Sequence, residues 1–453
     1  MVSLNKSGQN ILSAAGRHPS RHRQPRRTGH SQPQRTHART ALLATAVALL
    51  ATLSFSPPAL ASKDLAPTPY MGWDTYFGFD GHINEATILE QASNLVTSGL
   101  EHDGYRIIWL DSGWWTGSRA KDGQISVSPT QWPHGLAWLT KTLHAWGFKV
   151  GIYTDAGPTG CSGTNRGSYG HYQQDVNTFA AWGFDAVKVD FCGGDDLRLN
   201  PKNAYTQFED AILHNSSHRP MMLNICVYAQ PGQVSSGFPS FAASAFASYS
   251  WGYSVATSWR TDTDVGSPSG ITFADVLRNL DADATEPLAA GPGHWNDPDY
   301  LGPDLGMTDA QFQTQFSMWA MLAAPLMISD NLSTLSPASF ATVSNAQMIA
   351  IDQDRLGRQG TQAPPADVNV SPATGDGQVW VKPLEHGDYA VALLNIGSTA
   401  LTISTTTQAL RIPPAASYTL ANVWAGGSTT TSGPIAATVG ADSTVVFVVA
   451  PTS

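Results

Sequence analysis

A regular alternation of short apolar segments and amphipathic stretches runs through the chain between residues 70 and 330. Eight of the apolar segments have the length and composition of β-strands, and the stretches between them have helical periodicity. Such alternation favours parallel strands joined by crossover helices. The predicted strands are 70–73, 106–111, 149–155, 186–190, 221–227, 254–259, 289–295 and 326–330, and the clearest predicted helices are 85–98, 136–146, 172–182, 204–214, 273–282 and 308–322.

Eight strand–helix units predict a (β/α)8 TIM barrel of the α/β class. A doubly wound open sheet is the alternative, but a Gly-rich phosphate-binding turn does not follow the first predicted strand. From about residue 360 the texture changes to short strands (379–383, 389–395, 401–404, 444–449) separated by Gly, Ser, Thr and Pro turns. We therefore expect a catalytic barrel over residues 62–360 and an all-β antiparallel sandwich over 361–453.

Residues 1–61 have the pattern of a secretory signal peptide. A long basic stretch precedes an apolar run from Ala41 to Phe55 and the small-x-small signal Ala59-Leu60-Ala61, which predicts cleavage after Ala61. Arg26-Arg27 raises the twin-arginine route as an option. A membrane anchor is the alternative, but this run is shorter than the roughly 20 apolar residues of a spanning helix. We expect a secreted, extracellular protein that leaves the membrane after cleavage.

The charge of the remaining chain limits its partners. Residues 1–61 carry eight of the 25 Lys and Arg residues and none of the 35 acidic ones, so residues 62–453 have 17 basic and 35 acidic residues, a net charge of −18. A body this acidic repels phosphate backbones, which excludes nucleic-acid binding as a leading function.

Polar side chains follow the predicted strands, where a barrel carries its active site. They are mainly carboxylates with a few cations and aromatic neighbours, at Asp74, Asp111, Asp155, Lys188, Asp190, Arg260, Asp262, Asp264, Asp297 and Asp299. Such a rim suits sugar hydroxyls, and two carboxylates are the minimum needed to hydrolyse a glycosidic bond. A metal-dependent hydrolase would need a cluster of His ligands, whereas the recognised rim blocks hold only His294, so we expect neither a metal nor another cofactor.

Four longer blocks extend this interpretation: Thr68–Trp73 (TPYMGW), Gly151–Gly157 (GIYTDAG), Lys188–Cys192 (KVDFC) and Gly293–Asp299 (GHWNDPD). In this order they resemble the signature blocks of glycoside hydrolase family 27, the α-galactosidases (melibiases) and α-N-acetylgalactosaminidases. The resemblance continues through 324–326, 350–354 and 380–384, so it covers nearly all of the chain after the leader.

The resemblance implies an exo-glycosidase that removes terminal α-D-galactosyl residues with retention of configuration. Asp190 matches the nucleophile. The acid/base lies four residues after the Arg of a Ser-Trp-Arg block, here Arg260, which selects Asp264, with Asp262 as the competitor. Retention requires the two carboxyl groups to be about 5–5.5 Å apart.

The resemblance also assigns the sugar contacts and one disulfide. Lys188 matches a donor to O3 and O4, and Asp111 matches an acceptor from O4 and O6. The other substrate-binding positions are the aromatic residues Trp73 and Tyr153, Arg260 at O2 and the rim carboxylate Asp299. Cys161 and Cys192 match a disulfide pair, which leaves Cys226 as a buried free thiol.

Two departures from the family pattern affect the choice of sugar. Ser112 stands where the α-galactosidases usually carry a second Asp, and Val227 stands where they place an acidic residue that recognises O2. Isomalto-dextranase and β-L-arabinopyranosidase specificities, which occur in the same family, therefore stay open. A non-catalytic carbohydrate-binding barrel is a further alternative, but its mark would be the loss of a catalytic carboxylate, and Asp190 and Asp264 are both present.

Overall fold

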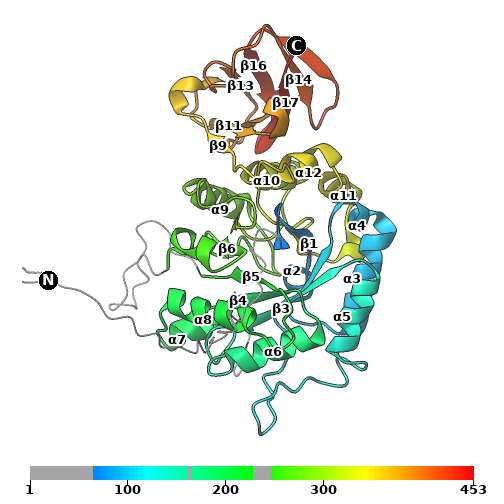
Figure 1. Ribbon diagram of the computed structural model, residues 1–453. Helices are drawn as coiled ribbons and strands as arrows, with labels where there is room; N and C mark the ends of the chain where they lie inside the picture. The colour runs from blue at the N-terminus through cyan, green and yellow to red at the C-terminus, as the bar shows by residue number, and fades with distance from the viewer. Residues whose placement is uncertain (1–64, 162, 164–165, 228–245, 453) are drawn as a thin grey trace, which may run out of the picture. The chain divides into compact units, whose positions relative to one another are not determined.

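The computed structural model describes residues 65–161, 163, 166–227 and 246–452. The predicted leader and its cleavage site lie outside these residues. Eight parallel strands form one sheet in the order β7-β6-β5-β4-β3-β2-β1-β8, which confirms the predicted barrel architecture (Figure 1). The strands are β1 (Met71–Asp74), β2 (Ile107–Leu110), β3 (Lys149–Asp155), β4 (Ala186–Asp190), β5 (Met222–Ile225), β6 (Ser258–Arg260), β7 (Trp295–Asp297) and β8 (Leu326–Ile328).

The sheet closes through Leu301, which lies four residues after the end of β7. Leu301 forms a parallel bridge with Ile328 of β8. Its N–H donates to the carbonyl of Met327 over 2.8 Å, and its own carbonyl accepts from the N–H of Ser329 over 2.8 Å. Residues 298–301 therefore both complete the barrel and form part of its C-terminal rim.

Helices lie outside the strands, as a parallel sheet buried on both faces requires (Figure 1). They are α2 (Tyr76–Phe79), α3 (Glu85–Ser98), α4 (Leu100–Asp103), α5 (Leu136–Ala145), α6 (Tyr172–Trp182), α7 (Cys192–Asp196), α8 (Pro201–Leu213), α9 (Phe273–Ala284), α10 (Asp309–Leu322), α11 (Pro337–Val343) and α12 (Ala346–Asp352). Capping boxes at Thr272 and Thr308 fix the first turns of α9 and α10. The described residues include no helix that is both long enough and apolar enough to span a bilayer.

Two predicted strands begin later than expected. The prediction of a strand over 289–295 was wrong for residues 289–294, because Gly291-Pro292-Gly293 forms a turn bridged by Gly291 and His294, and β7 starts at Trp295. The strand predicted at 254–259 starts at Ser258 instead, after a 3₁₀ turn over Gly252–Ser254. In both places the apolar composition continues through a turn.

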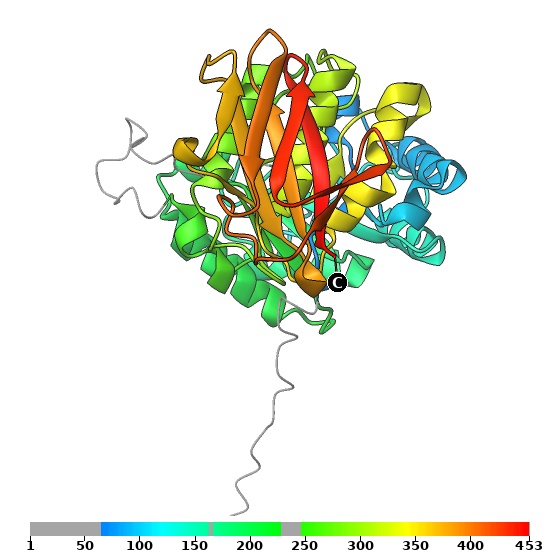
Figure 2. The ribbon, with the colours of Figure 1, turned by 90° about the horizontal axis from the view of Figure 1, so that it is seen from above.

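The C-terminal part of the chain forms two antiparallel sheets, which confirms the predicted β sandwich (Figure 2). A three-stranded sheet has the order β10-β13-β16, and a six-stranded sheet has the order β15-β14-β17-β12-β11-β9. The strands are β9 (Thr361–Gln362), β10 (Asn369–Ser371), β11 (Gly377–Pro383), β12 (Tyr389–Asn395), β13 (Leu401–Thr406), β14 (Tyr418–Asn422), β15 (Ser428–Thr431), β16 (Pro434–Val439) and β17 (Ser443–Pro451).

The six-stranded sheet buries both faces. Successive side chains of a strand point to opposite faces, and on β12 Ala392 and Leu394 belong to the hydrophobic core of the barrel while Val391 and Leu393 belong to the core between the two sheets. Helix α10 packs against the face of this sheet that points toward the barrel. Lys382 of β11 donates from Nζ to the carbonyl of Ala320 in that helix over 2.7 Å. The sheet therefore shares a core with the barrel.

Candidate active site

A cavity of about 870 Å³ opens at the carboxyl ends of the barrel strands. Six predicted catalytic or substrate-binding residues line it, together with both cysteines of the predicted disulfide: Asp111, Tyr153, Lys188, Asp190, Asp264 and Asp299. They come from β3, β4 and the loops after β2, β6 and β7, so segments more than 180 residues apart in sequence contribute to one cavity. Ser112, Cys226 and Val227 also line it.

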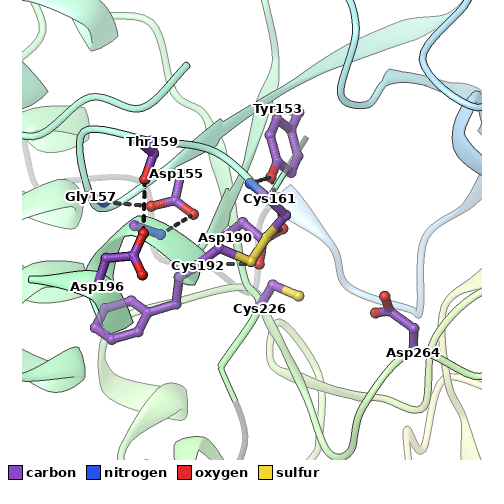
Figure 3. The surroundings of a disulfide bond; sticks show 12 residues. Tyr153, Asp155, Gly157, Thr159, Cys161, Asp190, Cys192, Asp196, Cys226 and Asp264 are labelled. Atoms are coloured by element: carbon purple, nitrogen blue, oxygen red, sulfur yellow. Dashed lines mark hydrogen bonds between the residues drawn. A yellow bond between two sulfur atoms is a disulfide. The ribbon is translucent and has the colours of Figure 1, made fainter. Parts of the chain in front are cut away.

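Asp190 ends β4 with its carboxylate held at both oxygens. The hydroxyl of Tyr153 donates to Oδ2 over 2.8 Å, and the backbone N–H of Phe191 donates to Oδ1 over 2.9 Å. The Sγ atom of Cys161 lies 2.9 Å from Oδ2. A disulfide sulfur carries no proton, so this last contact is not a hydrogen bond. Figure 3 shows Asp190 beside the disulfide, with Asp264 also in view.

Lys188 forms a buried ion pair on the same strand. Its Nζ donates to Oδ2 of Asp111 over 2.7 Å and to the hydroxyl of Tyr300 over 2.6 Å. The side chains of Lys188 and Asp111 are 9% and 3% exposed, so solvent screens their attraction little. Asp111 and the other nearby carboxylates hold the pKa of Lys188 well above its ordinary value, against the effect of burial.

Arg260 connects two carboxylates of the site. Its Nη1 lies 3.0 Å from Oδ1 of Asp264 and 3.0 Å from Oδ1 of Asp299. Its side chain is 2% exposed, whereas the side chain of Asp264 is 55% exposed. Asp264 is therefore the accessible carboxylate of this group.

Asp262, the competitor for the acid/base position, lies in a different environment. It is buried, accepts from the N–H of Thr263 over 2.7 Å, and has Arg278 within 3.7 Å. It is not among the residues that line the cavity. The geometry therefore favours Asp264 over Asp262 as the group that can reach a bound ligand.

Comparisons with known proteins agree with this arrangement. Residues 73–354 match the family model described as alpha galactosidase A, and residues 374–449 match the alpha galactosidase C-terminal beta sandwich domain. The chain is 37% identical over 365 residues to alpha-galactosidase A of Cellvibrio japonicus, covering 78% of this chain and 82% of that protein. The chain belongs to the α-galactosidase A family.

Solved structures of related proteins have the same fold. The α-galactosidase of Saccharomyces cerevisiae, solved with raffinose, superimposes with a TM-score of 0.73 at 25% identity, over 86% of this chain and 99% of that one. A β-L-arabinopyranosidase of family 27 from Geobacillus stearothermophilus also gives a TM-score of 0.73, at 17% identity over 86% and 98%, and shows the fold alone. The resemblance to family 27 is thus confirmed, and the chain is a glycoside hydrolase.

The remaining predicted site residues of this glycoside hydrolase lie around the cavity in different ways. Arg260 does not line it but touches two carboxylates that do. Trp73 is fully buried, with its Nε1 donating to the carbonyl of Asp330 over 2.7 Å, and does not line the cavity. Sequence reasoning missed Tyr300, Tyr76 and Phe191, which do. The position of Tyr300 directly after Asp299 was the one signal that could have indicated it.

The carboxyl groups differ in their proton affinity. Burial raises the pKa of Asp190, and Lys188 opposes this effect. Burial also raises the pKa of Asp299, to about 7, against the attraction of Arg260. The cavity walls tend to raise the pKa of Asp264, but Arg260 and then Lys188 bring it below its ordinary value. Of the two carboxyl groups on Arg260, Asp264 is thus the stronger acid.

The loops after β3 and β4 approach each other beside Asp190. A Cβ on Gly157 would lie 1.9 Å from the carbonyl carbon of Gly193, and a Cβ on Gly193 would lie 2.2 Å from the carbonyl oxygen of Thr159, so both positions require glycine. Asp155 accepts from the N–H groups of both glycines, and Figure 3 shows it within this contact. The predicted disulfide Cys161–Cys192 is present and joins the same loops, and Cys226 is a free, half-buried thiol.

These loops also contain a group of possible metal ligands. The ligand atoms of Asp155, Cys161, Asp190 and Cys192 lie within 4.8 Å of one another. The two sulfur atoms are bonded to each other and cannot act as thiolates, which are the ligand form of cysteine. The arrangement therefore fits a disulfide that supports Asp190 better than a metal centre.

Removing the disulfide is expected to destabilise the protein. The bridge closes a loop with a sequence separation of 31, so the double variant Cys161→Ser/Cys192→Ser should lose about 2–4 kcal/mol of unfolding free energy in a urea titration. Cys226→Ser, which keeps the bridge, is the control. Equal urea midpoints for the double variant and the wild-type protein would contradict a stabilising role.

Proposed function

We propose that the protein is a secreted retaining exo-glycosidase that hydrolyses terminal α-D-galactosyl residues of oligo- or polysaccharides. The observation that carries the proposal is one cavity lined by two carboxylates with contrasting environments: Asp190, fixed at both oxygens, and Asp264, which is half-exposed beside Arg260. A pair of carboxyl groups in different environments is what a double displacement needs. The α-galactosidase names of the relatives support the choice of sugar.

Asp190 acts as the nucleophile in this proposal. The bonds from Tyr153 and Phe191 orient its carboxylate, and Lys188 favours its ionised form. Its oxygen attacks the anomeric carbon as the bond to the leaving oxygen breaks, which gives a covalent glycosyl-enzyme. Water then attacks the same carbon and releases Asp190.

Asp264 transfers the proton in both steps. It first gives its proton to the leaving oxygen, and it then takes a proton from the water that attacks the intermediate. Arg260 and Lys188 favour the ionised form of Asp264 in the free site, which suits the second step. The first step needs the protonated form, so the proposal places activity on the acid side of neutrality.

The other predicted residues bind the sugar in this scheme. Lys188 and Asp111 lie 2.7 Å apart and present a donor and an acceptor to neighbouring hydroxyls, O4 being the one that both contact. Asp299 lines the cavity and is paired with Arg260, the residue that matches the contact to O2. Of the two aromatic positions, Tyr153 lines the cavity and is the one that can contact the sugar, because Trp73 is fully buried and does not line it.

Two lining residues keep other sugars of the family in the test. Ser112 accepts fewer hydrogen bonds than a second carboxylate, and Val227 offers no side-chain acceptor. Either difference is compatible with a sugar that lacks the galactose hydroxymethyl group or has the glucose configuration. These are the β-L-arabinopyranosidase and isomalto-dextranase alternatives.

Substitution of each carboxylate tests the mechanism. With nitrophenyl α-galactoside as substrate, Asp190→Asn should lower kcat by on the order of 10⁴-fold or more, and Asp264→Asn should lower it by about 10²–10⁴-fold because a general acid is lost. Asp262→Asn is the matched control and should change kcat only a few-fold. NMR of the first anomer released should show retention.

The results separate the proposal from its alternatives. Release from β-L-arabinopyranoside, or from an α-glucoside and isomaltosyl dextran, without release from α-galactoside would overturn the sugar and keep the mechanism. Inversion, or full activity of Asp190→Asn, would overturn the mechanism.

The pH profile follows from the same two groups. A pair with both carboxyls protonated lacks the nucleophile, and a pair with neither protonated lacks the acid, so only the pair with its single proton on Asp264 is productive. We expect kcat/KM to be bell-shaped with its maximum below pH 7, falling about tenfold per pH unit on the alkaline side. A rate that stays constant from pH 5 to pH 8 would contradict these roles.

Secretion has its own test. The full chain should be expressed in a bacterial host that has both the general secretory route and the twin-arginine route. We expect extracellular protein whose N-terminal residue is Ser62 by mass spectrometry. Material that retains residues 41–55 and stays with the membrane fraction would favour the anchor instead.

A further inference from the structure

Tyr300 completes a closed triangle of hydrogen bonds at one wall of the cavity. Lys188 Nζ donates to its hydroxyl over 2.6 Å, and the hydroxyl donates to Oδ2 of Asp111 over 3.0 Å. Lys188 and Asp111 are themselves joined over 2.7 Å. The tyrosine hydroxyl is therefore a third member of the buried ion pair.

The fold holds this hydroxyl in a fixed place. Tyr300 follows Asp299, whose φ of 84° turns the chain at the rim, and precedes Leu301, which is bonded into β8. Its ring packs edge-on against Phe77 with centroids 5.6 Å apart, and the residue is 8% exposed. Neighbours on both sides in sequence and in space thus restrict the ring.

The hydrogen bonds of Asp111 fix the orientation of its carboxylate. Its Oδ1 accepts from the N–H of Ser112 over 2.6 Å, while its Oδ2 accepts from Lys188 and from Tyr300. The carboxylate is fixed at both oxygens, with one acceptor position of Oδ1 left over. Among the described residues, Lys188 likewise directs two of its three N–H groups to Asp111 and Tyr300, which leaves one for a ligand.

We propose that Tyr300 determines specificity at the sugar O4 by holding Asp111 and Lys188 in one arrangement. The inference rests on the proposed function, in which these two residues contact O4. With both partners fixed, one donor and one acceptor direction are open, so the site reads a single orientation of the hydroxyl. Ser112, the residue after Asp111, carries no charge and does not supply the second carboxylate that the family usually has there. Tyr300 therefore contributes to recognition of O4 by fixing Asp111 and Lys188.

Discrimination between epimers follows from the cost of unpaired polar groups. A galactoside and a glucoside differ only in the orientation of O4. When a rigid buried pair meets the wrong orientation, its polar groups stay unpaired, which costs far more than a lost apolar contact. If Asp111 and Lys188 could turn, or if a water could enter beside them, the wrong epimer would be tolerated.

The variant Tyr300→Phe tests this role because it removes only the hydroxyl. The readout is the ratio of kcat/KM for nitrophenyl α-galactoside to that for nitrophenyl α-glucoside, together with the ratio of the inhibition constants of galactose and glucose. We expect the preference for galactose over glucose to fall by about tenfold or more in both ratios, chiefly because kcat/KM for the galactoside falls and galactose binds more weakly. Tyr105→Phe is the matched control, because Tyr105 is buried and its hydroxyl donates to the carbonyl of Val343.

The ratios do not depend on the fraction of folded enzyme, since both sugars are measured on the same preparation. Thermal unfolding with each sugar repeats the comparison without turnover, so a folded but inactive variant still gives an answer: galactose should raise the midpoint of the wild-type protein more than glucose, and Tyr300→Phe should lose this difference.

Two further outcomes are distinct. A wild-type protein that cleaves the galactoside while Tyr300→Phe keeps both ratios would overturn the role of Tyr300 and leave the proposed function intact. A wild-type protein that does not cleave the galactoside would overturn the proposed function and, with it, the role at O4.

Discussion

The buried charge of Lys188 is the constraint on which the site depends. An ammonium group this deep in a barrel is tolerated only when anions and acceptors surround it. Asp111 and Tyr300 are hydrogen-bonded to it, and the charges of Asp74, at the end of β1, and Asp190, at the end of β4, also act on it. In turn, the same ammonium lowers the proton affinity of Asp74 and Asp190, both of which burial raises. The cation and the carboxylates therefore stabilise one another's charged forms and offset the cost of burying them.

Arg260 forms the second centre of charge and separates the tasks of the carboxylates. Lys188 forms its ion pair with Asp111 at the end of β2, while Arg260 forms ion pairs with Asp264 and Asp299 in the loops after β6 and β7. Both Asp190 and Asp264 lie near positive charge, but Asp190 is held at both oxygens, whereas the side chain of Asp264 is 55% exposed. This division gives one cavity a fixed carboxylate and an accessible one, the contrast that acid–base and nucleophilic roles need.

The sequence predicted what depends on local pattern and failed where distant segments decide. Strands β3 and β4 and the helices α3 and α6 have the predicted bounds, because their apolar periodicity and their ends coincide. The segment before β7 was misassigned because its turn residues are embedded in an apolar run. Asp190, Lys188 and Asp111 could be placed at the cavity because barrel strands end on one rim. Tyr300 could not, since its importance arises only when the fold brings its hydroxyl into contact with Lys188 of β4 and with Asp111 after β2.

The C-terminal sheet has a structural task that follows from helix α10. This helix has ten buried residues on all its sides, a pattern of a helix covered by protein all round rather than of an ordinary surface helix. The barrel covers one side, and Trp380, Ala392 and Leu394 of the six-stranded sheet join the same hydrophobic core. Without the sheet, α10 would expose apolar surface and the carbonyl of Ala320 would lose Lys382. Helix α10 follows the rim segment that contains Asp299, Tyr300 and Leu301, and the Nε1 of Trp319 in this helix donates to the carbonyl of Asp299 over 2.8 Å. The sheet that covers α10 therefore also helps to fix one wall of the cavity. The sheet thus supports the site through packing, without needing to touch the sugar.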